Sequence, residues 1–284
     1  MNSLVFFIAI LLNTTALSHE HIDQSVFNID MSKYDRVNIY NNVGEINIRT
    51  TNSNKAVFET TRKIRATSSK KLKRAISEIQ VDTMIVDGEL FVFIDSPYMT
   101  LEQRGNNYWY QNHSYNNGDS FKSSGIDSEF DFEISLPANT DGLISTHKGD
   151  IEIKNVKGEI EVYNHFGDIS LSGVEDVAQV NSHHGSLKVL FDKQPQHDLS
   201  LGTHHGDITI SFKEVPSARL DLYSYHGSFF TDFEWQPLVS KVKTDKKNGK
   251  TKYKIGQNTN VQIGGGEHEI KFNSHHGDMY ILKH

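Results

Sequence analysis

Apolar and polar residues alternate along most of the chain, and glycine interrupts the alternation at regular intervals. Successive side chains of a β-strand point to opposite faces, so this pattern predicts short strands with one buried face, separated by turns. From residue 130 onward the spacing of apolar residues is that of strands rather than of helices. The chain is therefore expected to be an all-β protein in this region.

A repeated unit underlies the alternation. It consists of alternating apolar residues, a small polar residue, His, any residue, Gly, Asp or Ser, and alternating apolar residues again. The copies are LISTHKGDIEI (143–153), IEVYNHFGDISL (160–171), AQVNSHHGSLKV (178–189), LSLGTHHGDITI (199–210), LDLYSYHGSFFT (220–231), IKFNSHHGDMYI (270–281) and a degenerate early copy, VNIYNNVGEINI (37–48). Successive glycines from Gly149 to Gly227 are 18 or 21 residues apart, with a longer gap before Gly277. Periods of this size indicate a stacked array.

One copy cannot bury its apolar face alone, so neighbouring copies must cover it. We therefore predict a single-stranded, right-handed β-solenoid with rungs about 4.8 Å apart, and an antiparallel β-sandwich as the alternative. The small polar residue three positions before each glycine shares the inward parity of the core rows and is expected to satisfy backbone groups at the turn. The expected core rows include Ile160, Val162, Ile169, Leu171, Leu199, Leu201, Ile208 and Ile210.

The segment FEISLPANTDGLISTHKGDIEIKNVKGEIEVYNHFGDISL resembles the core of the DUF4097 family of proposed bacterial adhesins, and YKIGQNTNVQIGGGEHEIKFNSHHGDMYI resembles its closing glycine-rich rung. The resemblance is clear over residues 130–284 and loose over residues 25–100. It implies an extracytoplasmic protein with no known cofactor and no known catalytic residue. This chain carries His where relatives usually carry Ser or Asn before the glycine.

Three regions are expected along the chain. Residues 1–18 contain an apolar run followed by small residues, which predicts a secretory signal peptide cleaved near His19, with a retained anchor as the alternative. Residues 19–129 are expected to cap the solenoid of residues 130–284, with strands near 37–48, 55–65 and 81–95. A short amphipathic helix is predicted at 69–80 and a polar, aromatic-rich loop at 103–125.

Composition and the lack of catalytic motifs reduce the number of functional classes that the sequence is compatible with. The 284 residues include no Cys and carry a formal net charge of −7 with no strongly basic cluster, so no electrostatic footprint for nucleic acid is expected. The mature chain is expected to be free of membrane spans and located in the periplasm or outside the cell. No catalytic motif is recognisable, and because His and Asp recur in every copy rather than in one constellation, a non-enzymatic protein is predicted, with a glycan-active enzyme as a further alternative.

The histidines two positions before the glycines are His147, His165, His183, His204 and His275, with Tyr225 in one copy. By strand alternation they point outward and are expected to form a column. Three interpretations remain open: packing that fixes the turns, capture of Zn or Cu by imidazole, and pH sensing by ring protonation.

The aromatic residues Tyr108, Trp109, Tyr110 and Tyr115 are candidate contacts for a partner, or pack back onto the domain. The favoured function is an adhesin-like or scaffold protein of the bacterial cell envelope, with an envelope protein or glycan as partner and no cofactor. The alternative is a metal-binding or stress- and pH-sensing module that uses the His column.

Overall fold

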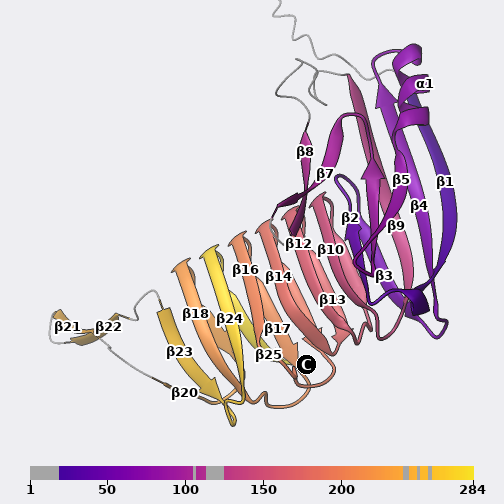
Figure 1. Cartoon of the computed structure of the whole chain (residues 1–284). Helices are drawn as coiled ribbons and strands as arrows, with labels where there is room; N and C mark the ends of the chain where they lie inside the picture. Colours follow the sequence, from indigo (N-terminus) through magenta and orange to yellow (C-terminus); the bar gives the residue numbers. More distant parts are fainter. Residues whose placement is uncertain (1–18, 105–106, 113–124, 239–242, 248–249, 255–257) are drawn as a thin grey trace, which may run out of the picture. The chain divides into compact units, whose positions relative to one another are not determined.

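The computed structural model describes residues 19–104, 107–112, 125–238, 243–247, 250–254 and 258–284 (Figure 1). The signal peptide prediction falls on residues 1–18, outside this range. The described chain forms strands, one α-helix and a short 3-10 helix at Met31–Lys33. The all-β prediction is therefore confirmed. Within the described residues no helix is both long and apolar enough to cross a membrane.

Two large mixed sheets contain most of the strands. We call the ten-stranded sheet A and the eleven-stranded sheet B. The order in sheet A is β1 (His19–Asp30), β4 (Lys55–Ala66), β9 (Ile126–Pro137), β3 (Ile46–Thr51), β11 (Ile151–Lys154), β13 (Ile169–Val174), β15 (Leu187–Phe191), β17 (Ile208–Phe212), β25 (Met279–Lys283) and β19 (Phe229–Thr231). The order in sheet B is β20 (Trp235–Pro237), β23 (Asn258–Ile263), β18 (Ala218–His226), β24 (His268–His276), β16 (Leu199–His205), β14 (Asp176–His184), β12 (Glu159–Phe166), β10 (Asp141–Lys148), β2 (Arg36–Tyr40), β6 (Glu89–Asp95) and β5 (Gln80–Val86).

Each sequence copy contributes one strand to sheet B and the next strand to sheet A, and equivalent residues of neighbouring copies pair in parallel. Ile144, for example, is paired with Val162, and Val162 with Val180. The degenerate early copy forms β2 and β3, which pair with β10 and β11 in the same register. The copies therefore stack on one another, and the antiparallel sandwich does not describe them.

The predicted continuous solenoid requires correction. The strands of the described residues form two mixed sheets and no closed solenoid, because β5, β23 and β20 pair antiparallel with their neighbours. The stack also departs from chain order. The last copy, β24 and β25, lies between the copy formed by β16 and β17 and the copy formed by β18 and β19 (Figure 1).

The core lies between the two sheets of the stack and is built from the predicted rows. The residues expected inside are at most 2% exposed: Ile160, Val162, Ile169, Leu171, Leu199, Leu201, Ile208 and Ile210. Phe191 and Phe212 stack on each other inside sheet A with ring centroids 5.5 Å apart. The apolar face that one copy cannot cover is therefore covered by its neighbours, as expected.

The chain divides into two compact units. Among the described residues, the first unit comprises 19–22, 63–79 and those within 96–128, and the second comprises 23–62, 80–95 and those within 129–284, which include the repeat stack. The predicted helix is α1 (Ser69–Glu78) in the first unit; the side chain of Ser68 caps it by accepting a hydrogen bond from the Lys71 amide, and Ala75 is buried. Whether this unit acts as a cap remains a prediction.

Part of the predicted 103–125 loop is instead a hairpin. Antiparallel β7 (Met99–Arg104) and β8 (Asn107–Asn112) pair in the first unit. A second hairpin, β21 (Lys243–Lys247) and β22 (Lys250–Lys254), lies between β20 and β23 in the chain. Sequence alone did not predict either pairing, because the polar composition of both segments is equally typical of loops.

Candidate functional site: two files of stacked rings

The predicted His column exists, and we call it the first file. It runs in the order His147, His165, His183, His204, His275 and Tyr225. Successive ring centroids are 4.6–5.1 Å apart, and the ring planes lie within 23° of parallel. Tyr225 stands at the end of the file rather than inside it, because the last copy inserts before its own. Parallel pairing of equivalent residues accounts for the spacing.

A second file of rings runs beside the first and was not predicted. Its order is Phe166, His184, His205, His276 and His226, with centroids 4.8–5.0 Å apart and planes within 11° of parallel. Lys148 holds the equivalent register position one copy before Phe166. The doublet His-His-Gly, which recurs at 183–185, 204–206 and 275–277, was the signal that sequence reasoning overlooked.

Both rings of a doublet lie on the outside of the corner. Strand alternation would send neighbouring side chains to opposite faces, yet the rings of His183 and His184 have centroids only 4.4 Å apart and meet edge to face at 72°. His204 with His205 repeats this contact at 4.4 Å and 70°. The second ring belongs to the last residue of its sheet B strand, where the chain begins to turn. Alternation therefore fails as a guide at the turn.

Glycine at the turn permits the close stacking beneath the rings. Gly167 and Gly206 have φ values of +137° and +147°, which side chains other than glycine rarely adopt. A Cβ atom on Gly206 would lie 2.2 Å from the carbonyl oxygen of Gly185 in the neighbouring copy. The Gly206 amide donates a hydrogen bond to the carbonyl oxygen of His276 on the other side, at 3.0 Å. The turns are thus in direct backbone contact.

Four of the small polar residues bind a carbonyl oxygen at the turn of a neighbouring copy: Thr146, Asn164, Ser182 and Thr203. Asn164 donates through Nδ2 to the carbonyl oxygen of Gly149 at 2.8 Å, and Thr203 donates through Oγ1 to that of Gly185 at 2.9 Å. Each bond reaches the turn of the neighbouring copy and satisfies a carbonyl there. Ser274 holds the same register position, and its buried hydroxyl has no partner.

The aspartates after the glycines form a third ladder. Oδ1 of Asp150 accepts the backbone N–H of Asp168 at 2.9 Å, and Oδ1 of Asp168 accepts that of Ser186 at 2.8 Å. Oδ1 of Asp207 accepts the N–H of Asp278 at 2.8 Å in the same way. The carboxylates therefore bind backbone amides of the next copy.

The environment of the files favours neutral imidazole. Burial is the main cause that lowers the pKa of His165, and the nearby charges of His147, His183 and His184 lower it further. Burial and neighbouring imidazoles also lower the pKa of His205 and His276, and burial lowers that of His147. The Nδ1 atoms of His165, His204 and His275 are buried without a hydrogen-bond partner. Protonation would place an unsatisfied N–H at each of these atoms, so the ring is expected to carry its proton on Nε2.

The files do not fit a shared zinc or copper ion. Imidazole ligands bind zinc at about 2.0–2.1 Å, which requires nitrogens roughly 3 to 3.5 Å apart. Near-parallel rings with centroids 4.6–4.9 Å apart hold equivalent nitrogens farther apart than that. Among the described residues, three metal-ligating side chains have ligand atoms within 4.8 Å of one another at Glu159, Asp176 and His197, on the other end of the sheet B strands. There Nδ1 of His197 already lies 2.9 Å from Oδ2 of Asp176.

The other candidate residues lie in the first unit or outside the described chain. Tyr108, Trp109 and Tyr110 are on β8, and Tyr108 is half-buried. Tyr115 lies outside the described residues. The role of these residues in binding remains a prediction.

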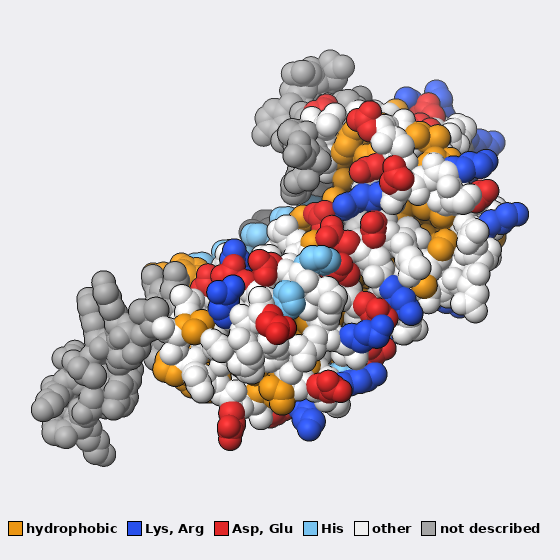
Figure 2. Space-filling model, turned by 60° about the horizontal axis from the view of Figure 1, so that its bottom comes forward, with side chains coloured by type: hydrophobic (Ala, Val, Ile, Leu, Met, Phe, Trp, Pro, Cys, Tyr) orange, Lys and Arg blue, Asp and Glu red, His pale blue; other side chains and the backbone are white. Residues whose placement is uncertain are grey.

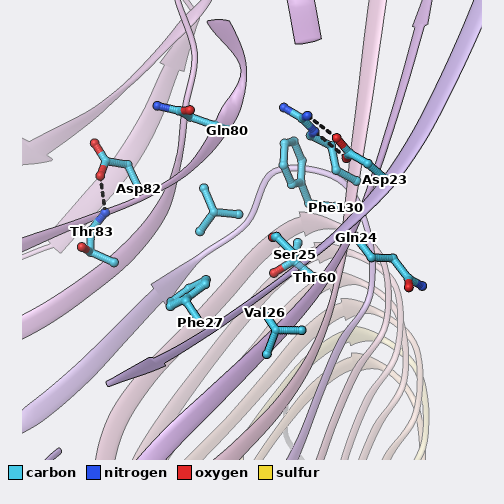
Figure 3. A pocket seen from close by; sticks show the side chains of 12 residues that line it. Asp23, Gln24, Ser25, Val26, Phe27, Thr60, Gln80, Asp82, Thr83 and Phe130 are labelled. Atoms are coloured by element: carbon cyan, nitrogen blue, oxygen red, sulfur yellow. Dashed lines mark hydrogen bonds and ion pairs between the residues drawn. The ribbon is translucent and has the colours of Figure 1, made fainter. Parts of the chain in front are cut away.

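A cavity of about 520 Å³ lies in the second unit among β1, β4, β5 and β9 (Figure 3). Val26, Phe27 and Phe130 line it, together with the ion pair of Arg62 and Asp23, in which Nε and Oδ1 are 2.9 Å apart. These strands lie at the opposite end of the sheet orders from the last copies.

The face drawn in Figure 2 is mixed in charge. Asp and Glu side chains are interspersed there with Lys and Arg, and His side chains lie among them.

Comparisons with known proteins concern the repeat region and the fold. A family model described as Toastrack DUF4097 matches residues 138–281. No curated protein sequence matches the chain. The structure is similar to that of a proposed cell adhesion protein from Clostridium sporogenes, at 13% identity over 93% of this chain and 100% of that chain, with a TM-score of 0.40. It is also similar to a proposed adhesin from Bacteroides fragilis, at 13% identity over 92% and 97%, with a TM-score of 0.30. Scores this low give no argument about a shared partner or activity.

Proposed function

The chain belongs to the Toastrack DUF4097 family, and from this premise we propose that it is a non-enzymatic, adhesin-like scaffold protein of the bacterial cell envelope. The observation that supports the proposal is the pair of ring files, which repeats one arrangement along several copies. An active site is normally a single constellation, whereas a periodic surface suits contact with an extended partner. The files are the proposed contact surface.

The location is part of the same proposal. The apolar run of residues 4–17 followed by small residues supports export by a signal peptide, which would place the mature protein in the periplasm or outside the cell. The parallel stack supports a scaffold role, because each copy is held by hydrogen bonds to the next. Right-handed winding of the stack is proposed on the chirality of parallel strand connections. The partner would be an envelope protein or glycan.

Binding to envelope material tests the proposal. The mature protein is incubated with cell-wall and outer-surface fractions and cosedimented, and the variant His184→Ala/His205→Ala is compared with His197→Ala. We expect the double variant to lose most of the bound fraction and the control to keep it, since His197 lies outside both files. Hydrolysis of any glycan in a panel of cell-wall polysaccharides, or equal binding by the two variants, would contradict the proposal.

A second function, sensing of acid, is favoured by one observation. Burial and neighbouring imidazoles hold the pKa of His165, His205 and His276 below its ordinary value, so acidification adds charge to rings that are in contact with other imidazoles. A structural response would appear as a change in amide hydrogen exchange at the corner residues between pH 7.5 and pH 5. Unchanged exchange there would remove this function while leaving the scaffold proposal in place.

A further inference from the structure

We propose that the hairpin of β21 and β22, together with the exposed residues of β20 that precede it, attaches the protein to the surface of an anionic phospholipid bilayer. The partner is the headgroup layer, which the protein contacts without crossing the membrane. The inference goes beyond the proposed function, because it does not involve the ring files and adds a second contact surface.

The charge of the hairpin is the first support. Its ten residues, 243–247 and 250–254, include six Lys and one Asp, a formal charge of +5. The whole chain has a formal net charge of −7, so the remaining residues together carry −12. The expectation that the chain has no strongly basic cluster is therefore wrong for this segment, because the acidic remainder hides it in the net charge.

The register of the hairpin gathers this charge on one face. Residues directly opposite each other in an antiparallel pair share a face, and alternate residues of a strand do so too. One face therefore carries five Lys and one Asp, at positions 243, 245, 247, 250, 252 and 254. Lys243 pairs with Lys254 and Lys247 with Lys250, and like charges directly opposite each other destabilise a hairpin in water. A partner with many closely spaced negative charges relieves that repulsion.

Exposed apolar side chains next to the hairpin in the chain are the second support. Trp235 is 46% exposed and Leu238 is 40% exposed. Trp235 belongs to β20, the edge strand of sheet B, and its ring meets that of Phe229 edge to face with centroids 6.3 Å apart. The Leu238 amide donates a hydrogen bond to the carbonyl oxygen of Asn260 at 3.0 Å, which fixes the backbone there. Trp and Leu beside basic residues are typical of segments that lie at the surface of a membrane.

Covalent connection keeps the apolar residues and the basic face close together. Lys243 follows Leu238 by five residues, and an extended chain advances at most about 3.6 Å per residue, so their Cα atoms lie within about 18 Å of each other. At the other end of the hairpin, Asn258 begins β23 four residues after Lys254. Since β23 pairs with β20, both ends of the hairpin are tied to the same two strands, and the two features are able to meet one surface.

The combination favours a bilayer over a nucleic acid in solution. A nucleic acid would be held by the lysines alone and would leave Pro237 and Leu238 in water, whereas a headgroup layer takes up both charge and apolar surface. The acidic residues on this stretch of the described chain are Asp232, Glu234 and Asp245, three against six lysines. The net attraction to an anionic surface therefore remains.

Vesicle binding tests the inference. The whole mature protein is mixed with vesicles of phosphatidylcholine alone, or of phosphatidylcholine and phosphatidylglycerol in equal amounts, and the bound fraction is measured by flotation. We expect binding to the anionic vesicles to be tighter than to the neutral vesicles by about tenfold or more, and to weaken as added salt screens the charges.

Removal of the like-charge pairs locates the site. A lysine near an anionic surface contributes roughly fivefold in affinity. The variant Lys243→Gln/Lys247→Gln/Lys250→Gln/Lys254→Gln is therefore expected to lose about 25-fold or more, which is the effect of two lysines at full strength.

The matched control removes the same number of charges elsewhere. Each of the four lysines replaced in it is paired with a carboxylate, and the variant is Lys154→Gln/Lys193→Gln/Lys213→Gln/Lys271→Gln. Both quadruple variants have the same net charge, so a difference between them reports the position of the lysines; the control is expected to stay within about threefold of the parent. Melting temperatures establish that both are folded. If the hairpin variant is not, Lys243→Gln/Lys254→Gln replaces it, with Lys154→Gln/Lys271→Gln as its control.

Trp235 supplies a readout at the proposed contact itself. The chain contains two tryptophans, so Trp109→Phe leaves Trp235 as the single one. Anionic vesicles are expected to shift its emission to shorter wavelength, and brominated acyl chains are expected to quench it, because the ring enters the headgroup region. Trp235→Ala is expected to weaken vesicle binding by about fivefold or more.

Several results would overturn the inference. Equal binding of neutral and anionic vesicles, equal loss of affinity in the two quadruple variants, or an emission spectrum of Trp235 that vesicles leave unchanged would each do so. Binding of single-stranded DNA or polyphosphate as tight as that of anionic vesicles, at the same salt concentration, would overturn the assignment to a bilayer. Binding of envelope fractions through the ring files is measured separately and does not depend on any of these outcomes.

Discussion

Replacement of Gly206 by Ala tests the claim that the turns of neighbouring copies are in backbone contact. The added Cβ would lie 2.2 Å from the carbonyl oxygen of Gly185 and 2.5 Å from its carbonyl carbon. Neither atom belongs to a flexible side chain, so one turn must move away from the other. The residue would also have to hold a φ of +147°, which alanine disfavours.

The expected loss in free energy of unfolding follows from these two effects. A non-glycine residue in this backbone region costs about 1–3 kcal/mol, and overpacking against a fixed neighbour costs about 1–3 kcal/mol more. The total of about 2–6 kcal/mol corresponds to a fall in melting temperature of roughly 4–24 °C, since about 1 kcal/mol shifts a domain of this size by roughly 2–4 °C. The hydrogen bond that the Gly206 N–H donates to the carbonyl oxygen of His276, 3.0 Å from N to O, would lengthen as the turn moves.

Thermal and urea unfolding of the purified protein measure the effect, with Gly202→Ala, in the preceding strand β16, as the matched control. A Cβ on Gly202 would meet the side chain of Asn181, which can rotate away, and the nearest atom outside that side chain is the carbonyl oxygen of Asn273, 3.8 Å distant. The control is therefore expected to be near neutral. If Gly206→Ala were as stable as Gly202→Ala, the contact between turns would not be what holds the stack.

Three further results are expected. Asp168→Ala removes the acceptor 2.8 Å from the Ser186 amide and should cost about 1 kcal/mol in urea unfolding, whereas Asp168→Asn should recover most of it. The melting temperature should fall between pH 7.5 and pH 5. Imidazoles such as His165 have a lowered pKa in the folded chain, so their stabilisation is complete above the unfolded value of about 6.5 and is lost as pH falls; an unchanged value would contradict it. Ser68→Ala should speed amide exchange in the first turn of α1, at a cost of about 1 kcal/mol, because it removes the cap on Lys71; exchange equal to that of Ser68→Asp would refute the role of the cap.

The stack could be predicted because the sequence pattern that produces it, alternating apolar residues and a recurring glycine, repeats in every copy. Alternation placed Val162 and Leu201 in the core, and the recurrence of glycine placed like residues beside like. The inward small polar residues followed from the same parity, and Asn164 and Thr203 bind the turns as expected. Strand alternation and the recurrence of glycine were therefore enough to predict the features that every copy shares.

The second file and the position of the last copy depend on contacts that cannot be predicted from the local sequence pattern. His184 falls where the strand bends into the turn, so alternation does not apply to it there, and the second file was not predicted. The insertion of β24 beside β16 depends on pairing between segments far apart in the sequence, and the longer gap before Gly277 was its only trace. The metal interpretation depends on the distance between ring nitrogens, which the type of side chain alone does not give.

The position of the last copy bears on how the chain assembles. Strand β18 is made before β24 but pairs with it on one side and with β23 on the other, so it has neither neighbour until residues 258–276 exist. A polypeptide that emerges amino end first can form the earlier copies one after another. The copy formed by β18 and β19 cannot pair until the later strands are made, so its apolar row stays uncovered until then. Deletion of residues 268–283 would therefore remove the β24 partner of β18 and the β25 partner of β19, and the damage from a late stop codon would reach back about fifty residues, to Ala218, into sequence that was translated intact.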